Sequence, residues 1–90
     1  MSVSYELHHY VFDAQAVGAF AQLIVDLRQA KTKKERAKFV TMISGFVRSM
    51  QYLRTDQSIN GNLIEVHERF DVATGKTTYD FIFEVAVDEN

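Results

Sequence analysis

The architecture of this chain is set by residues 63–87, which read LIEVHERFDVATGKTTYDFIFEVAV. Two runs rich in β-branched and aromatic residues flank a short segment that contains glycine, and this pattern is typical of a β-hairpin. We expect strands over residues 63–72 and 77–87, joined by a loop at residues 73–76.

The register of the hairpin follows from the alternation of its side chains. With this loop, Phe70 lies opposite Tyr79 and Ile64 lies opposite Val85, so the large apolar side chains share one face. Leu63 falls on the other, polar face. The hairpin therefore predicts a sheet with one buried face and one polar face.

Glu68 interrupts the apolar face, because the register places it opposite Phe81. A carboxylate in such a place needs a partner or a position at the edge of the core. We expect Glu68 at the rim of the core, and the alternative is an ion pair with a helix arginine such as Arg36 or Arg48.

The polar face of the hairpin carries a candidate patch for a partner. It consists of Glu65, His67, Ile82 and Glu84. A histidine among carboxylates can also bind a metal ion or transfer protons. We expect neither here and interpret the patch as a surface for binding, with no metal and no catalytic role.

Residues 3–12 alternate with period two and predict another strand. One face, which we expect to be buried, carries Val3, Tyr5, Leu7, His9 and Val11. The opposite face carries Glu6, His8 and Tyr10, which would join the polar face of the hairpin. Asp13 follows and suits a helix N-cap.

Two helices fill the middle of the chain. Residues 14–30 predict a first helix that is apolar over most of its circumference and so needs two packing partners. These would be the sheet on one side and a second helix, or a second subunit, on the other. Thr32 and Glu35 form a capping box for a second helix over residues 33–53, in which Gly45 marks a place where the helix could break.

The order of elements is therefore β-α-α-β-β in a single domain that spans residues 1–90. We predict an α+β fold, a three-stranded, mostly antiparallel sheet with a helical hairpin packed on one face. The sequence leaves open which hairpin strand the first strand joins. Because such a sheet has free edges, we expect a homodimer with one continuous six-stranded sheet.

Several classes of protein are excluded by what the sequence lacks. It contains no cysteine and no apolar run near the ~18 residues of a membrane span, and we expect a cytoplasmic protein that does not enter membranes. Residues 74–77, TGKT, resemble the end of a phosphate-binding loop, but the earlier glycine and the following helix are missing. We therefore expect no cofactor and no enzymatic activity.

Charge is segregated along the chain. Residues 28–54 carry eight basic side chains against Glu35 alone, whereas residues 55–90 carry two basic and eight acidic side chains. The candidate partner-binding residues form a basic helix face, namely Lys31, Lys33, Lys34, Lys38 and Arg48. Such a face suits an acidic protein surface.

We therefore interpret the chain as a non-catalytic binding protein of the adaptor, regulator or inhibitor type, which contacts another protein and forms a homodimer. The alternative is a nucleic-acid-binding protein that uses the basic second helix, residues 31–54. A third class, an enzyme with a sheet-face site that contains His67 and Glu65, has less support because the sequence shows no nucleophile constellation.

Overall fold

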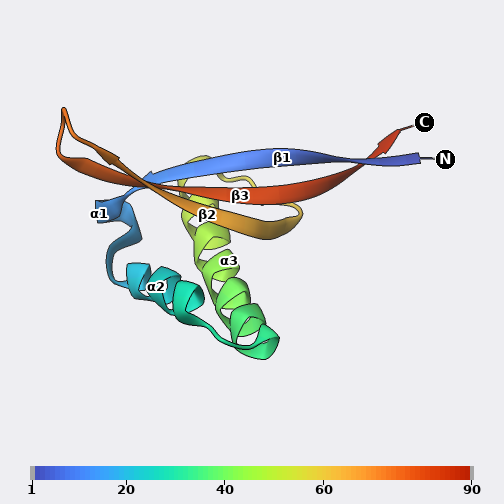
Figure 1. Ribbon diagram of the computed structural model, residues 1–90. Helices are drawn as coiled ribbons and strands as arrows, with labels where there is room; N and C mark the ends of the chain where they lie inside the picture. Colours follow the sequence, from blue (N-terminus) through green and yellow to red (C-terminus); the bar gives the residue numbers. More distant parts are fainter. Residues whose placement is uncertain (1, 90) are drawn as a thin grey trace.

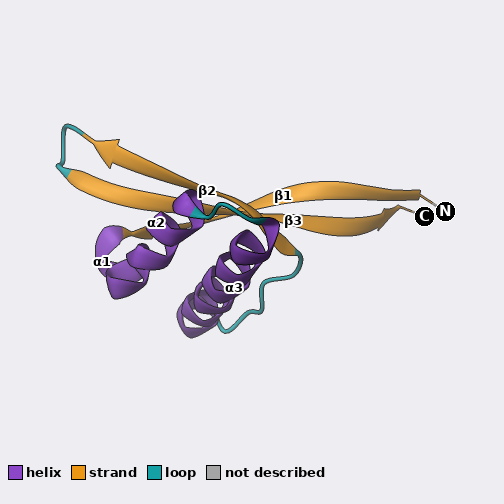
Figure 2. Cartoon of the chain, turned by 60° about the horizontal axis from the view of Figure 1, so that its bottom comes forward, coloured by secondary structure: helices purple, strands orange, loops and turns teal. Residues whose placement is uncertain are grey.

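The structure is a computed structural model that describes residues 2–89, and it confirms the predicted α+β architecture. The strands form an antiparallel sheet, and the helices lie on one side of it (Figures 1 and 2). We call the side away from the helices the outer face. The elements are β1 (Ser2–Asp13), α1 (Ala14–Val17), the 3-10 turn η1 (Gly18–Phe20), α2 (Ala21–Gln29), α3 (Lys33–Thr55), β2 (Asn62–Asp71) and β3 (Lys76–Glu89).

β3 is the central strand, and the order β1-β3-β2 settles where the first strand lies. β1 pairs with β3 along its whole length, from Ser2 opposite Glu89 to Asp13 opposite Thr78. β2 pairs only as far as Asn62 opposite Glu84. Beyond that point, β1 and β3 continue as a two-stranded ribbon that ends where both termini lie together (Figure 1).

The hairpin turn closes one residue earlier than predicted. Asp71 pairs with Lys76, because the Asp71 carboxylate accepts from the Ala73 N–H at 2.9 Å and the Asp71 carbonyl accepts from the Gly75 N–H at 2.7 Å. Gly75 has φ +68°, which glycine adopts without strain. From Glu65 to Asp71 the side-chain faces are kept, but each cross-strand pair shifts by two residues from the predicted register. Val72 consequently lies in the loop and is 86% exposed.

A β-bulge at Ile64 changes the start of β2. The register shifts between Leu63 and Glu65, so one extra residue lies in this strand. Leu63 is therefore buried in the core at 6% exposure, while Ile64 is 47% exposed. The prediction for these two residues was wrong, because alternation alone does not reveal an inserted residue.

The predicted buried face of β1 was also wrong. Phe12 is 6% exposed and its ring lies 6.1 Å from that of Phe81, and Tyr10 packs edge-on against Phe83 at 5.5 Å. The even-numbered residues thus face the helices, because the two aromatic rings fill more of the core than the aliphatic side chains would. The odd-numbered residues lie on the outer face, including Val3, Tyr5, Leu7 and Val11, which are about half exposed or more.

The first predicted helix is interrupted, whereas the second is continuous. Gly18 adopts φ +55° and ψ −136°, which ends α1 and leads into η1 and α2. α3 runs through Gly45 without a break. The apolar residues of the first helical region lie between the sheet and α3, as the stacking of Phe20 on Phe46 at 4.8 Å illustrates. α3 therefore covers part of this apolar surface, while Val25 remains 40% exposed.

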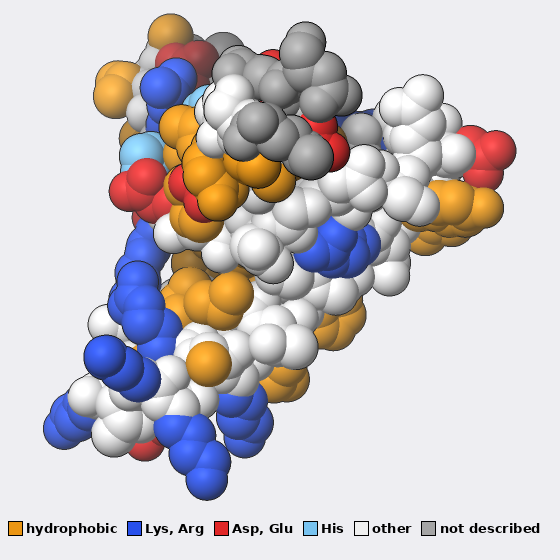
Figure 3. Space-filling view, turned by 90° about the vertical axis from the view of Figure 1, so that its right-hand side faces the viewer, with side chains coloured by type: hydrophobic (Ala, Val, Ile, Leu, Met, Phe, Trp, Pro, Cys, Tyr) orange, Lys and Arg blue, Asp and Glu red, His pale blue; other side chains and the backbone are white. Residues whose placement is uncertain are grey.

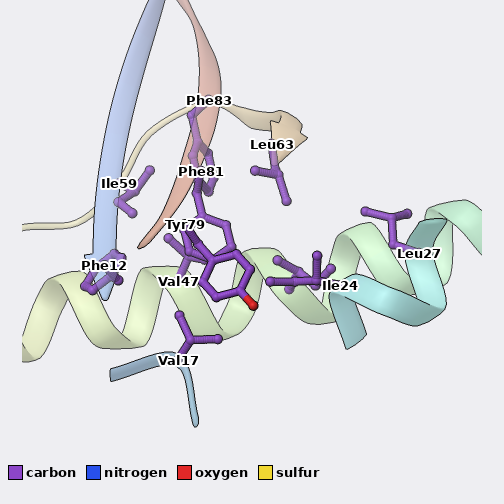
Figure 4. Close-up of a cluster of buried hydrophobic side chains, with 11 residues drawn as sticks. Phe12, Val17, Ile24, Leu27, Val47, Ile59, Leu63, Tyr79, Phe81 and Phe83 are labelled. Atoms are coloured by element: carbon purple, nitrogen blue, oxygen red, sulfur yellow. The ribbon is translucent and has the colours of Figure 1, made fainter. Parts of the chain in front are cut away.

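The core joins all three strands to the helices (Figure 4). Phe81 and Phe83 of β3 are fully buried at its centre, together with Ile43 and Val47 of α3. The other members of the cluster are Phe12, Val17, Ile24, Leu27, Ile59, Leu63 and Tyr79. Within residues 2–89, none of the helices combines the length and the apolar character that a membrane crossing needs.

Candidate functional site

The start of α3 is fixed by the predicted capping box. The Thr32 hydroxyl accepts from the Glu35 N–H at 3.1 Å, and the Glu35 carboxylate accepts from the Lys31 N–H at 3.4 Å. Asp13 caps α1 in the same way, accepting from the Ala16 N–H at 2.8 Å. The first cap orders the connection between α2 and α3, where the basic residues are concentrated.

Four of the predicted binding residues lie together on this connection and on the first turns of α3. Lys31, Lys33, Lys34 and Lys38 are all exposed. Figure 3 shows Lys and Arg side chains gathered at the lower end of the molecule. These lysines give this end of the molecule a positive surface.

Arg48, the fifth predicted residue, is not part of this surface. It is half-buried near the other end of α3, where it donates hydrogen bonds to the carbonyl oxygens of Ile59 and, at 2.7 Å, Gly61. Its guanidinium lies 5.4 Å from the Phe83 ring centre. Arg48 therefore orders the loop between α3 and β2, and we remove it from the candidate site.

A groove runs between α2, α3 and β2, next to the lysines. Its volume is about 360 Å³. Six of its nine lining residues are apolar, although polar atoms make up at least half of the exposed lining. Arg28 and Arg36 supply positive charge, opposed by the carboxylate of Glu65. The lining residues are Ile24, Leu27, Arg28, Arg36, Val40, Leu63, Ile64, Glu65 and Val66. We call this feature, together with the four lysines, the basic groove.

Arg28 and Arg36 line the groove but were not predicted as site residues. The sequence did contain a signal for Arg36. Arg36 and Val40 are four residues apart and so lie on one side of α3, which places a basic and an apolar side chain together. Arg28 comes from a different helix, and its place beside the groove depends on how α2 packs against α3. That packing is not visible in a linear sequence.

Glu68 lies at the rim of the core, as predicted, but its partners differ from those expected. It pairs with Tyr79 across the strands, and its carboxylate lies 3.9 Å from the Arg28 guanidinium. Neither Arg36 nor Arg48 takes the predicted role. Both charges of the Glu68–Arg28 pair are about half exposed, so the pair contributes little to stability.

The phenol of Tyr79 is the group in this cluster whose pKa departs clearly from its ordinary value. Burial raises the pKa most, and a hydrogen bond to Glu68 and the negative charge of that carboxylate raise it further. The positive charge of Arg28 acts in the opposite direction. The folded protein therefore holds this proton more tightly than the unfolded chain does.

This shift predicts a loss of stability at high pH. The pKa of Tyr79 is higher in the folded protein than its value of 10.0 in the unfolded chain. The contribution of Tyr79 to the free energy of unfolding is therefore fully present below pH 10.0 and is lost as the pH rises through the pKa of the folded state. Urea denaturation of wild type and Tyr79→Phe should give free energies of unfolding that converge above that pH. At pH 7 the variant should be less stable by about 1 kcal/mol, the worth of one hydrogen bond. Parallel curves would show that Tyr79 ionises equally in both states.

The structure brings together only part of the predicted patch of Glu65, His67, Ile82 and Glu84, which lies on the outer face. Glu65 lies opposite Ile82, and the Glu65 carboxylate contacts the His67 ring at 2.8 Å. Ile82 is 5% exposed and so offers little surface. Glu84 lies opposite Leu7, farther along β3.

Two further residues, His9 and Asp80, join this side of the sheet. The His9 ring lies 2.8 Å from the Asp80 carboxylate, and Asp80 is the cross-strand partner of His67. The expectation that Glu6, His8 and Tyr10 would lie here was wrong, because β1 presents its odd-numbered residues. Among the side chains that the structure describes, no group of three or more His, Cys, Asp or Glu is placed to hold a metal ion.

No protein-family model matches this chain, and neither does any curated protein or solved structure. The function is therefore argued from the basic groove itself.

Proposed function

We propose that this protein is a non-catalytic binding module that holds an acidic segment of another protein in the basic groove. The observation that carries the proposal is that Arg28 and Arg36 line the groove together with apolar residues, and that the exposed Lys33, Lys34 and Lys38 lie on the same helix as Arg36. A segment that alternates acidic and apolar side chains would place its apolar groups against the apolar residues and its carboxylates on the arginines.

An extended conformation of this segment fits the place of the groove in the fold. β2 is an edge strand, and its residues 64–66 line the groove. A strand added beside β2 would pair with backbone groups that no other strand of the described chain occupies. Glu65 and Glu68 are the unfavourable charges in this arrangement. The Glu65 carboxylate contacts the His67 ring, and the half-exposed Glu68 carboxylate, 3.9 Å from Arg28, must give way to a carboxylate of the ligand.

Nucleic acid is the second candidate, and the lysines favour it. Single-stranded nucleic acid is usually held by exposed aromatic rings between basic residues. Phe39 is the aromatic residue nearest to the lysines in sequence, and it is half-buried, with the Lys38 ammonium 5.9 Å from its ring. The apolar residues of the groove fit a peptide better than they fit a phosphate backbone.

The proposal predicts a charge-specific loss of peptide binding. We expect a fluorescein-labelled peptide of alternating glutamate and leucine to bind the wild type. The affinity should fall about tenfold in Arg36→Glu, which corresponds to about 1.4 kcal/mol. Fluorescence anisotropy measures both affinities.

Arg69→Glu is the matched control. It changes the net charge equally, but Arg69 lies opposite Thr78 near the hairpin loop, and it is exposed like Arg36. Affinity within about twofold of wild type is expected for this control. Equal losses in the two variants would mean that the peptide responds only to overall charge, and the proposal would fail.

A duplex DNA and a single-stranded RNA, titrated at several salt concentrations, separate the two candidates. Binding of either with a steep salt dependence, while the peptide does not bind, would favour the nucleic-acid alternative.

A further inference from the structure

β1 is an unprotected edge strand. The edge of β1 that points away from β3 has no neighbouring strand among residues 2–89. The pairing of β1 with β3 keeps one register from Ser2 to Asp13. Natural edge strands are usually shielded by lysine, proline or a bulge. β1 contains no lysine, arginine or proline. Apart from the Val11 carbonyl, which accepts from the Arg54 guanidinium, this edge is therefore a regular template for another strand.

The side chains of β1 also favour pairing. Its odd-numbered apolar residues are exposed on the outer face, with Tyr5 at 65% and Leu7 at 55%. Cross-strand contacts with a further strand would shield part of this surface. The apolar surface and the free backbone edge lie on the same strand.

One hydrogen bond shows which backbone groups of β1 point outward. The Val11 carbonyl accepts from the Arg54 guanidinium of α3 at 3.2 Å, so this carbonyl points away from β3. Residues of an antiparallel strand alternate between the two sides, and the other odd-numbered residues therefore also direct their N–H and C=O groups to the free edge. The Val11 carbonyl keeps a second lone pair for another donor.

A second copy of β1 can satisfy these groups only in a few registers. Odd-numbered residues must lie opposite odd-numbered residues, so a two-fold axis passes through a residue of the strand. An axis at Glu6 places two Glu6 carboxylates opposite each other, which is unfavourable. An axis at His8 places two His8 rings opposite each other and sets Val3 opposite Asp13.

An axis at Leu7 avoids both problems. Each Glu6 then lies opposite His8 of the second copy, which places a carboxylate beside an imidazole ring twice, and each Val3 lies opposite Val11. Glu6 and His8 already contact each other within one chain at 3.3 Å, so their side chains lie on the same face of β1. We propose that two copies of this chain pair their β1 strands antiparallel about Leu7, which joins their sheets into one. This inference does not depend on the acidic ligand of the basic groove.

Single cysteines test the register, because the natural chain has none and a disulfide can form only between two copies. In Leu7→Cys the two Cα atoms would lie about 5.5 Å apart, within the range that a disulfide spans. In the control Tyr5→Cys the two residues are displaced along the strands by roughly 13 Å. We expect covalent dimer to form about tenfold faster in Leu7→Cys than in Tyr5→Cys under mild oxidation.

A mixture of Glu6→Cys and His8→Cys separates edge pairing from contact between outer faces. Edge pairing predicts that the mixture forms heterodimer faster than either variant alone forms homodimer, because these residues lie on the helix side of β1. Contact through the outer faces would leave the mixture no faster and would overturn the proposal. A wild-type monomer in sedimentation equilibrium at high micromolar concentration would also overturn it. Arg36→Glu should dimerise like wild type, so loss of the ligand and loss of the dimer are distinguishable.

Discussion

A Phe81→Ala variant should lose about 3–5 kcal/mol of unfolding free energy, the typical cost of deleting a buried phenylalanine ring. Phe81 is fully buried at the centre of β3, and its ring meets those of Phe12, Phe20 and Tyr79 at centroid distances of 6.1, 6.3 and 6.4 Å. It therefore links β1, the first helical region and the central strand. A domain of this size has about 5–15 kcal/mol in total, so much of the population should unfold on mild heating.

The matched control is Phe70→Ala, the same chemical change at a site that is 63% exposed. Phe70 lies opposite Thr77 near the hairpin loop, away from the core. We expect a loss of about 0.5 kcal/mol or less for this control. Urea denaturation followed by circular dichroism measures both variants, and similar losses would mean that the core is not centred on Phe81.

Among the variants proposed here, Gly61→Ala should have the second largest effect. It should lower the free energy of unfolding by about 2–4 kcal/mol through backbone strain and steric overlap. Gly61 has φ +90°, and a Cβ atom there would lie 2.2 Å from the carbonyl oxygen of Glu84 and 2.9 Å from a methyl group of Val85. The first of these atoms belongs to the central strand and cannot move without disturbing the sheet. The Gly61 carbonyl also accepts from Arg48, so a displaced loop would lose that bond.

Gly45→Ala is the same chemical change but should have the opposite effect on stability. Gly45 lies within α3 with nothing within 4 Å of a built Cβ atom. Alanine there should raise the free energy of unfolding by up to about 1 kcal/mol, the difference in helix propensity. Thermal unfolding of the two variants should therefore move in opposite directions. An unchanged melting temperature for Gly61→Ala would show that this loop does not close against β3.

The local signals in the sequence predicted the elements well. Capping residues such as Thr32 act within four residues of themselves, and the hairpin is fixed by the alternation of neighbouring side chains. The element order and the placement of the helices on one face follow from these signals. The partner strand of β1 was not predictable, because it depends on contacts between distant segments.

The errors in the fold have two physical origins, tertiary packing and local backbone geometry. In β1, both faces carry apolar residues, and the choice between them depends on what Phe12 meets in the assembled core. The bulge at Ile64 and the earlier turn at Asp71 each change the pairing without leaving a mark in the alternation. Tertiary contacts decide the buried face of β1, whereas the turn at Asp71 is set by local hydrogen bonds to the Ala73 and Gly75 N–H groups.

The candidate site was predictable only as a charge pattern. The sequence located the lysines on the start of α3 but grouped Arg48 with them, although its side chain binds backbone carbonyls elsewhere. Arg28 belongs to the site because α2 folds back along α3. The homodimer and the acidic partner remain proposals that the experiments above are designed to test.

An NMR titration with the glutamate–leucine peptide tests the central claim, that an acidic segment binds in the basic groove, most directly. We expect the largest backbone amide shifts at residues 24–40 and 63–66, and small shifts on the outer face of β1 and at the hairpin loop. Shifts confined to the outer face, or no shift while the peptide is present in large excess, would contradict this account of the protein.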